Sequence, residues 1–248
     1  MSESKNIHEG HRQRLKNRFI ESGLDTFEAH NILELLLFYS IPRKDTNEIA
    51  HNLLKHFGTL RGVFDAEFEE LLNVPYITEN SATLIKLFPA LAREYLTGKY
   101  TNDRKFDTAE KIGSYLCDRF FGETKEVVYA LFLSNNFELI ATVKIHEGTV
   151  NSAQVSTRKI VDYCVKYNAS MVVIAHNHPR GNICPSMEDI ETTRRLLSAF
   201  QAIDITLLEH YVVAGDDYYT IINSVDTLRC KNKDNRDFFR RSLFIEED

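Results

Sequence analysis

The segment from His176 to Asp189 combines side chains that could bind a metal ion. His176 and His178 end an apolar run, 170–175, whose composition is typical of a β-strand. Because side chains alternate between the two faces of a strand, both imidazoles are expected on the same side. Asp189 is the nearest candidate for a third ligand. Three protein ligands and an open fourth position are typical of a catalytic zinc site rather than a structural one.

The same segment also has a purely structural interpretation. A His-x-His pair at a strand end is often a surface pair without metal, and Ser186 is a good N-cap for a helix. Asp189 follows it three positions later, and an apolar-periodic stretch continues to Phe200. The two interpretations are compatible, because a helix that begins opposite a strand end would bring Asp189 back toward the histidines.

The spacing of these residues matches a known signature. His-x-His, seven residues, Ser, two residues and Asp is the pattern of the JAMM (MPN-plus) metalloproteases, here on His176, His178, Ser186 and Asp189. The longer string HNHPRGNICPSMEDI resembles the bacterial RadC branch of that family. Two further segments match the same branch: 148–152 and 207–213. The resemblance covers nearly the whole chain and implies a JAMM/MPN-type, cytidine-deaminase-like α/β domain with one Zn²⁺ per chain, held by His176, His178 and Asp189.

The JAMM signature also requires a glutamate far upstream, because a group must take the proton of the activated water. Glu126 is the best match, since family members carry this glutamate at the head of a strand and the buried-strand pattern 127–133 follows it. Glu147, just before Gly148, and Glu138, near a predicted turn, are the alternatives. An ordinary solvated strand-end acid is the simpler interpretation of Glu126.

The resemblance implies hydrolysis of a peptide or isopeptide bond in a protein or peptide substrate. Glu126 would act as general base and then general acid, and Ser186 would donate a hydrogen bond to the developing oxyanion. His210 could support the ligands, and Arg180 could pair with a substrate carboxylate. The simpler interpretations are a satisfied core histidine and a solvated turn residue. Nucleobase deaminases are not indicated, because their Pro-Cys-x-x-Cys and His-x-Glu patterns are absent here.

The composition is that of an ordinary globular protein. The chain has 248 residues, of which 43% are hydrophobic and 27% charged, enough for two modest domains. Residues 1–18 are polar and charged, so no signal peptide is expected, and the apolar run 32–41 is too short to cross a membrane. Four cysteines lie far apart without Cys-x-x-Cys, so a disulfide framework is not expected and a reducing cytoplasm fits.

The pattern predicts a division of the chain near residues 97–107. Residues 1–98 form an all-α domain, 99–107 a polar linker, 108–226 an α/β domain with a mixed sheet, and 227–248 a charged tail. The helices expected in the first part are 30–39, 45–56 and 81–95. In the second part we expect helices at 109–120, 157–167 and after Ser186, and strands at 126–133, 137–145, 170–175 and 205–213.

The all-α part resembles, at residues 71–82, the helix-hairpin-helix of RadC proteins, which binds the DNA backbone. That motif relies on glycines that let backbone N–H groups approach a phosphate. Here Tyr76 and Thr78 take those places, and a tyrosine adopts positive φ only at a cost. Residues 1–98 carry 11 Lys and Arg against 14 Asp and Glu, unlike a typical DNA-binding domain. We therefore expect weak or no DNA binding, and no membrane partner.

Two classes of function follow. The first is a zinc-dependent peptidase or isopeptidase with an appended helical domain. The second is a DNA-binding or DNA-repair accessory protein whose metal site is structural or vestigial. The complete JAMM signature favours the first class, because a site kept only for packing would not need every one of its chemical groups.

Overall fold

The fold is described from a computed structural model, covering residues 3–42, 44–148, 156–179 and 181–222. The chain separates into two compact units, Met1–Ala92 and Arg93–Asp248. Three sequence features singled out above lie outside the described residues: the motif residues 149–152, Arg180 and the predicted tail 227–248.

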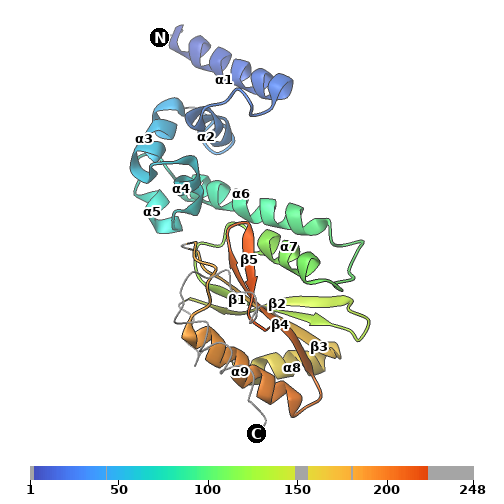
Figure 1. Ribbon diagram of the computed structural model, residues 1–248. Helices are drawn as coiled ribbons and strands as arrows, with labels where there is room; N and C mark the ends of the chain where they lie inside the picture. Colours follow the sequence, from blue (N-terminus) through green and yellow to red (C-terminus); the bar gives the residue numbers. More distant parts are fainter. Residues whose placement is uncertain (1–2, 43, 149–155, 180, 223–248) are drawn as a thin grey trace. The chain divides into compact units, whose positions relative to one another are not determined.

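The first unit is helical in its described part (Figure 1). Its elements are α1 (Glu3–Ser22), α2 (Ala29–Leu37), α3 (Asn47–Phe57), α4 (Leu60–Asp65), α5 (Phe68–Leu72) and the beginning of α6 (Glu79–Gly98). The core consists of aliphatic side chains such as Leu33, Leu37 and Leu53, which are fully buried. None of the described helices is both long and apolar enough to cross a membrane.

Helices α5 and α6 form a hairpin whose turn differs from expectation. Tyr76 has a φ of +70°, the left-handed conformation that glycine favours. The flanking Val74 and Ile77 are buried and anchor the turn, while the Tyr76 ring is solvent-exposed and lies 3.7 Å from Nζ of Lys44. The hairpin therefore keeps a positive φ without a glycine, because the surrounding packing holds the turn.

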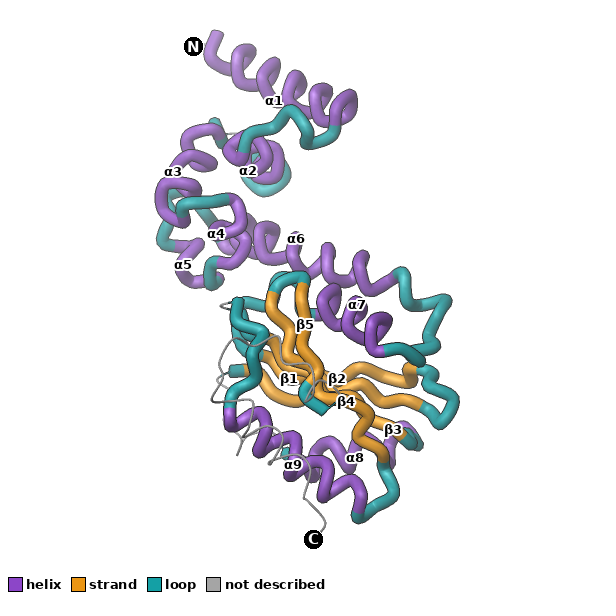
Figure 2. The backbone as a smooth tube through the Cα atoms, in the orientation of Figure 1, coloured by secondary structure: helices purple, strands orange, loops and turns teal. Residues whose placement is uncertain are grey.

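The second unit is a layered α/β domain around a mixed sheet, five-stranded within the described residues (Figure 2). The strands are β1 (Val127–Leu133), β2 (Leu139–Glu147), β3 (Met171–Asn177), β4 (Thr206–Ala214) and β5 (Asp217–Thr220). The helices are α7 (Ala109–Arg119), α8 (Thr157–Tyr167) and α9 (Met187–Gln201). The strand order is β2-β1-β3-β4-β5, with β3 and β4 parallel and the other neighbours antiparallel. The predicted mixed α/β fold is confirmed.

Strand alternation gives the sheet two covered faces (Figure 1). On one face, Val173 and Ala175 of β3 belong to a core shared with α7. On the other, Val172 and Ile174 belong to a core shared with α8 and α9. The same alternation assigns the residues that end β3, so that His176 faces the α9 side and Asn177 faces the α7 side.

Segment 99–107, predicted to be a linker, packs into the second unit instead. Phe106 is fully buried, and its ring packs edge-on against Tyr115. Two aromatic residues, Tyr100 and Phe106, flank the polar stretch and join this core. The unit boundary falls inside α6, where Arg93 pairs with Glu123 at 2.8 Å and ties the end of the helix to the second unit.

The cysteines differ from expectation in one place. Cys117 and Cys164 are free, but Cys184 is disulfide-bonded. The spacing of the cysteines did not predict this bond, because no Cys-x-x-Cys or similar local pattern includes Cys184.

Candidate metal centre

Three potential metal ligands lie together where β3 ends and α9 begins. His176 is the last residue but one of β3, and His178 directly follows the strand. Asp189 is in the first turn of α9. One ligand atom from each lies within 4.8 Å of the others. Nε2 of His176 is 3.1 Å from Nε2 of His178 and 3.2 Å from Oδ1 of Asp189. Among the described residues, this is the group that could hold a metal ion.

Local structure fixes both ends of this group. The backbone N–H of His178 donates to the carbonyl of Val213 (2.7 Å), which extends the parallel pairing of β3 with β4 past the strand end. At the start of α9, the backbone N–H and the hydroxyl of Ser186 both donate to Oδ2 of Asp189, each at 2.7 Å. This capping box orients the Asp189 carboxylate and leaves Oδ1 toward His176.

His176 is held from behind by His210 of β4. Oγ1 of Thr193 donates to the backbone carbonyl of Asp189 (2.7 Å), so its single proton is used there. Nδ1 of His210, 2.6 Å from the same oxygen, must therefore carry a proton and donate. Nε2 of a neutral His210 then accepts from Nδ1 of His176 (2.9 Å). This chain leaves the lone pair of His176 Nε2 facing the other two ligands.

His178 has the same tautomer for an independent reason. Its Nδ1 contacts the carbonyl oxygen of Asn182, which can only accept a hydrogen bond. Its Nε2 lone pair therefore also points inward. Two imidazole lone pairs and a carboxylate oxygen converge without a proton between them, an arrangement that repels itself unless a cation lies there. The donor set fits a metal ion such as zinc.

Burial and neighbouring groups set the charge states of Asp189 and His210. Burial acts to raise the pKa of Asp189, but the proximity of His176 and the hydrogen bonds from Ser186 outweigh it and hold the pKa well below its usual range. Burial first, and then the neighbouring His176, lower the pKa of His210 to about 3. Asp189 is therefore ionised and His210 neutral at physiological pH, as ligation and the relay require.

Strand alternation indicates which face of the sheet Glu126 lies on. In the antiparallel pairing of β1 with β3, Val128 stands opposite His176. Every second residue of a strand returns to the same face, so Glu126, which directly precedes β1, is expected on the face of Val128 and His176. The Glu126 side chain is half-buried, and its carbonyl accepts from the N–H of Gly148 (2.8 Å).

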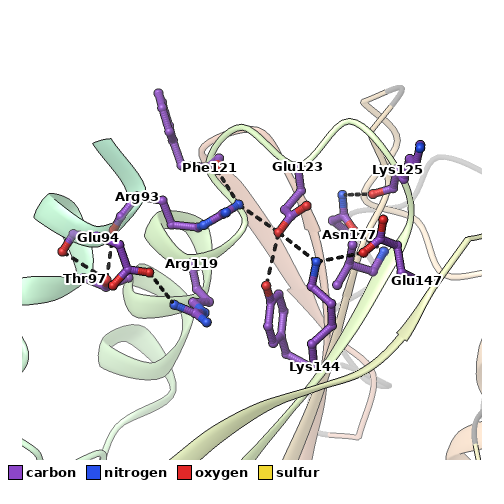
Figure 3. A network of polar contacts seen from close by, with 12 residues as sticks. Arg93, Glu94, Thr97, Arg119, Phe121, Glu123, Lys125, Lys144, Glu147 and Asn177 are labelled. Carbon is purple, nitrogen blue, oxygen red and sulfur yellow. Dashed lines mark hydrogen bonds and ion pairs between the residues drawn. The ribbon is translucent and has the colours of Figure 1, made fainter. Parts of the chain in front are cut away.

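The two alternative glutamates lie elsewhere. Glu147 pairs across the sheet with Val127, on the α7 face, and its carboxylate binds Nζ of Lys144 at 2.9 Å (Figure 3). That hydrogen bond lowers the pKa of Glu147. Glu138 lies at the far end of β1, where its N–H donates to Oγ of Ser134 (3.3 Å). Of the three carboxylates, Glu126 is the one that strand alternation assigns to the face of His176 at this end of β1.

Comparison with known proteins places these residues within one family. The model of the RadC-like JAB domain matches residues 106–225, which contain the whole ligand group. UPF0758 protein FN0909 of Fusobacterium nucleatum subsp. nucleatum is 34% identical over 229 residues, which cover 90% of this chain and 98% of that protein.

The chain belongs to the UPF0758 (RadC) family. UPF0758 protein RALTA_A2508 of Cupriavidus taiwanensis is a further relative, 30% identical over 216 residues, with 87% of this chain and 95% of that protein covered. The resemblance to RadC found in the sequence is confirmed. The candidate metal centre lies in the JAB domain of this RadC-family protein.

The RadC site contains residues to which the sequence assigned no role. Thr193 and the carbonyl of Asn182 set the tautomers of the histidines, and Asn177 contacts the backbone around Glu126. Thr193 had a recognisable signal, since it follows Asp189 by one helical turn and so shares its face. The other two contacts depend on loop and strand-end geometry, for which the sequence has no periodic pattern. The Ser186 hydroxyl donates to Asp189 here.

Proposed function

We propose that this RadC-family protein is a zinc-dependent hydrolase of the JAMM type, which cleaves a peptide or isopeptide bond. The observation that supports this most is the convergence of two Nε2 lone pairs and one carboxylate on a single point. Their tautomers are set by Thr193, through His210, and by the carbonyl of Asn182. A group arranged only for packing would place a proton between two imidazoles 3.1 Å apart.

The residues divide the chemistry among themselves. A zinc ion held by His176, His178 and Asp189 would act as a Lewis acid and make water acidic enough to attack at neutral pH. Glu126 takes the proton of the attacking water and delivers it to the departing amine nitrogen. Ser186 turns its hydroxyl from Asp189 toward the oxygen of the scissile carbonyl as negative charge develops there.

Exposure indicates where a substrate would approach. The side chain of His178 is 21% exposed, whereas those of His176 and Asp189 are 2% and 7% exposed. The scissile bond would therefore enter from the side of His178, close to where β1 begins and Glu126 precedes it. A base on the open side of the site can reach both the water and the leaving group.

The test is the pair Glu126→Gln and Glu147→Gln in zinc-loaded protein, screened against fluorogenic peptides and lysine-isopeptide conjugates. Glu126→Gln should keep zinc and lower hydrolysis by about 10²- to 10⁴-fold, the usual contribution of a general acid–base. Glu147→Gln should leave zinc and hydrolysis unchanged, because its carboxylate lies on the other face. Loss of zinc in Glu126→Gln, or an unchanged rate, would contradict the assignment of Glu126.

A second candidate function is DNA binding by the first unit, as an accessory or repair protein. The observation that favours it is the positive φ of Tyr76, which keeps the turn of a helical hairpin. Against it stand the exposed tyrosine ring, where a phosphate would have to approach, and the excess of acidic residues in 1–98. Affinity for duplex DNA that falls steeply with salt would establish this function, because phosphate contacts release counterions. We expect weak binding with a shallow slope.

A further inference from the structure

Asn177 stands between the two histidine ligands but faces away from them. Strand alternation directs it to the α7 side of the sheet, and it is 4% exposed. A buried primary amide needs partners for its carbonyl and its amino group. Its carbonyl and its amino group must therefore both form hydrogen bonds inside the protein.

Both ends of the Asn177 amide bind the backbone on either side of Glu126, and Figure 3 shows the contact with Lys125. Nδ2 donates to the carbonyl of Lys125 (2.9 Å), and Oδ1 accepts from the N–H of Val127 (2.7 Å). One side chain thus brackets the residue that lies between those two. Only an amide can do this, since a carboxylate has no proton to donate and a shorter hydroxyl cannot span both groups.

The Asn177 side chain provides hydrogen bonds at a point where the backbone pairing of β1 with β3 has ended. The β1–β3 ladder ends at the pair Val128–His176. Beyond it, the N–H of His178 donates to Val213 of β4. The Asn177 side chain takes over from the backbone on the β3 side, while the N–H of Gly148 binds the carbonyl of Glu126 on the β2 side. The backbone around Glu126 is therefore held from both neighbouring strands.

A second anchor fixes the approach to this segment (Figure 3). The carboxylate of Glu123 accepts hydrogen bonds from Arg93 (2.8 Å) and from the hydroxyl of Tyr129 (3.1 Å), and lies 3.4 Å from Nζ of Lys144. Glu123 is largely buried, so this charge must stay paired. The chain from Glu123 to Val127 is thus fixed at both ends.

We propose that Asn177 is a positioning residue, which sets the Glu126 carboxylate relative to the metal ligands on either side of Asn177 itself. The inference rests on the proposed function of Glu126. Three consecutive residues, 176–178, then carry two ligands and the clamp on the base. Movement of one strand end shifts all three together, so the spacing between metal and base is kept. Catalytic groups need placement within about 0.5 Å, which a single rigid connection can supply.

The probe for this inference is acetohydroxamate, a small acid that chelates metal ions and needs a nearby carboxylate to accept its proton. Its affinity for full-length, cobalt-loaded protein can be read from the visible absorption of the metal. Glu126→Gln should weaken it about tenfold, the loss of one hydrogen bond to a charged group. Asn177→Asp, which replaces the donor to Lys125 by a carboxylate oxygen that repels its carbonyl, and Asn177→Ala should weaken it between about threefold and tenfold. Cobalt affinity should stay within about twofold, because no ligand is changed.

Tyr115→Phe is the matched control. It removes a partly buried hydrogen bond on the α7 face, between the Tyr115 hydroxyl and Oγ1 of Thr142 (2.7 Å), which involves neither Asn177 nor the backbone around Glu126. It should leave acetohydroxamate affinity unchanged. Amide exchange in the wild type gives a test that needs no variant, because the N–H of Val127 should exchange as slowly as the core of β1.

The outcomes separate the two proposals. If Glu126→Gln weakens acetohydroxamate but folded, cobalt-loaded Asn177 variants do not, the positioning role is overturned and the proposed function stands. If Glu126→Gln itself binds like the wild type, Glu126 is not beside the metal and the proposed function fails. Fast exchange at Val127 in the wild type would overturn the clamp directly.

Discussion

The candidate metal centre depends on the identity of its side chains, whereas the helical hairpin depends on the conformation of its backbone. At the metal centre the information lies in side chains: each group needed for ligation is present, and hydrogen bonds set the tautomer of each histidine. At the hairpin it lies in the backbone, since the turn keeps a φ of +70° at Tyr76 although the side chain usually linked with that conformation is missing.

The difference shows which parts of a site can be exchanged. Replacing a metal ligand removes the lone pair that binds the metal, so the sequence must contain that particular residue type. A backbone conformation can be held by buried neighbours such as Val74 and Ile77, so the sequence can lose the glycine and keep the turn. We therefore expect a function that depends on close approach to that turn to be weak, because the exposed tyrosine ring stands there.

The largest expected effect is that zinc stabilises the second unit against unfolding but not the first. At a free concentration a hundredfold above its Kd, it should stabilise the second unit by about 2.7 kcal/mol, by mass action. The first unit should not respond, because its described residues hold no group of three ligands. Amide exchange followed by mass spectrometry, peptide by peptide, measures both units in one sample. Equal protection of both units, or protection that persists in Asp189→Ala, would break the distinction.

The hydrogen-bond relay behind His176 should contribute nearly as much. Thr193→Val removes the acceptor of His210 and should lower zinc affinity by about 10- to 100-fold, the usual effect of losing a partner that orients a ligand. Thr192→Val is the matched control, because this neighbouring buried hydroxyl has no hydrogen-bond partner among the described residues. Competition with a chromophoric chelator measures both. Similar losses in the two variants would show that the relay does not set the site.

The smallest effect concerns the backbone of the hairpin. Tyr76→Gly and Tyr76→Ala both remove the ring, but alanine keeps the steric cost of positive φ. The glycine variant should therefore be more stable to unfolding by about 1 kcal/mol. Thr83 is an exposed position inside α6, where glycine is the poorer helix former. Thr83→Gly should therefore be less stable to unfolding than Thr83→Ala, by about 1 kcal/mol. Urea unfolding of the four variants decides this, and a glycine variant at position 76 no more stable than alanine would mean the turn is not strained.

The sequence predicted the regular elements and the ligand group better than the connections between them. The helix expected at 157–167 is found at those residues, because its apolar period and its Ser156 cap are local signals. The His-x-His and Ser-x-x-Asp patterns led to one cluster because alternation and capping each fix direction. The helix and the ligand group were predictable because periodicity, capping and strand alternation each act between residues a few positions apart.

Contacts between distant segments were not predictable in this way. Segment 99–107 reads as a polar linker, yet Phe106 is buried against α7. The amide of Asn177 meets Lys125 and Val127 across fifty residues of sequence or more, with no periodicity to announce it. The left-handed turn at Tyr76 also departs from the residue preference that sequence reasoning uses, since burial of its neighbours decides the conformation.

Metal content, measured by elemental mass spectrometry, tests whether His176, His178 and Asp189 bind a metal ion. The wild type, His176→Ala and His178→Ala would be purified without chelator or added metal and compared per chain. The geometry predicts about one zinc ion per wild-type chain and its loss in both variants. No metal in the wild type, even after zinc is supplied at neutral pH, would contradict the metal centre and the hydrolase proposed from it.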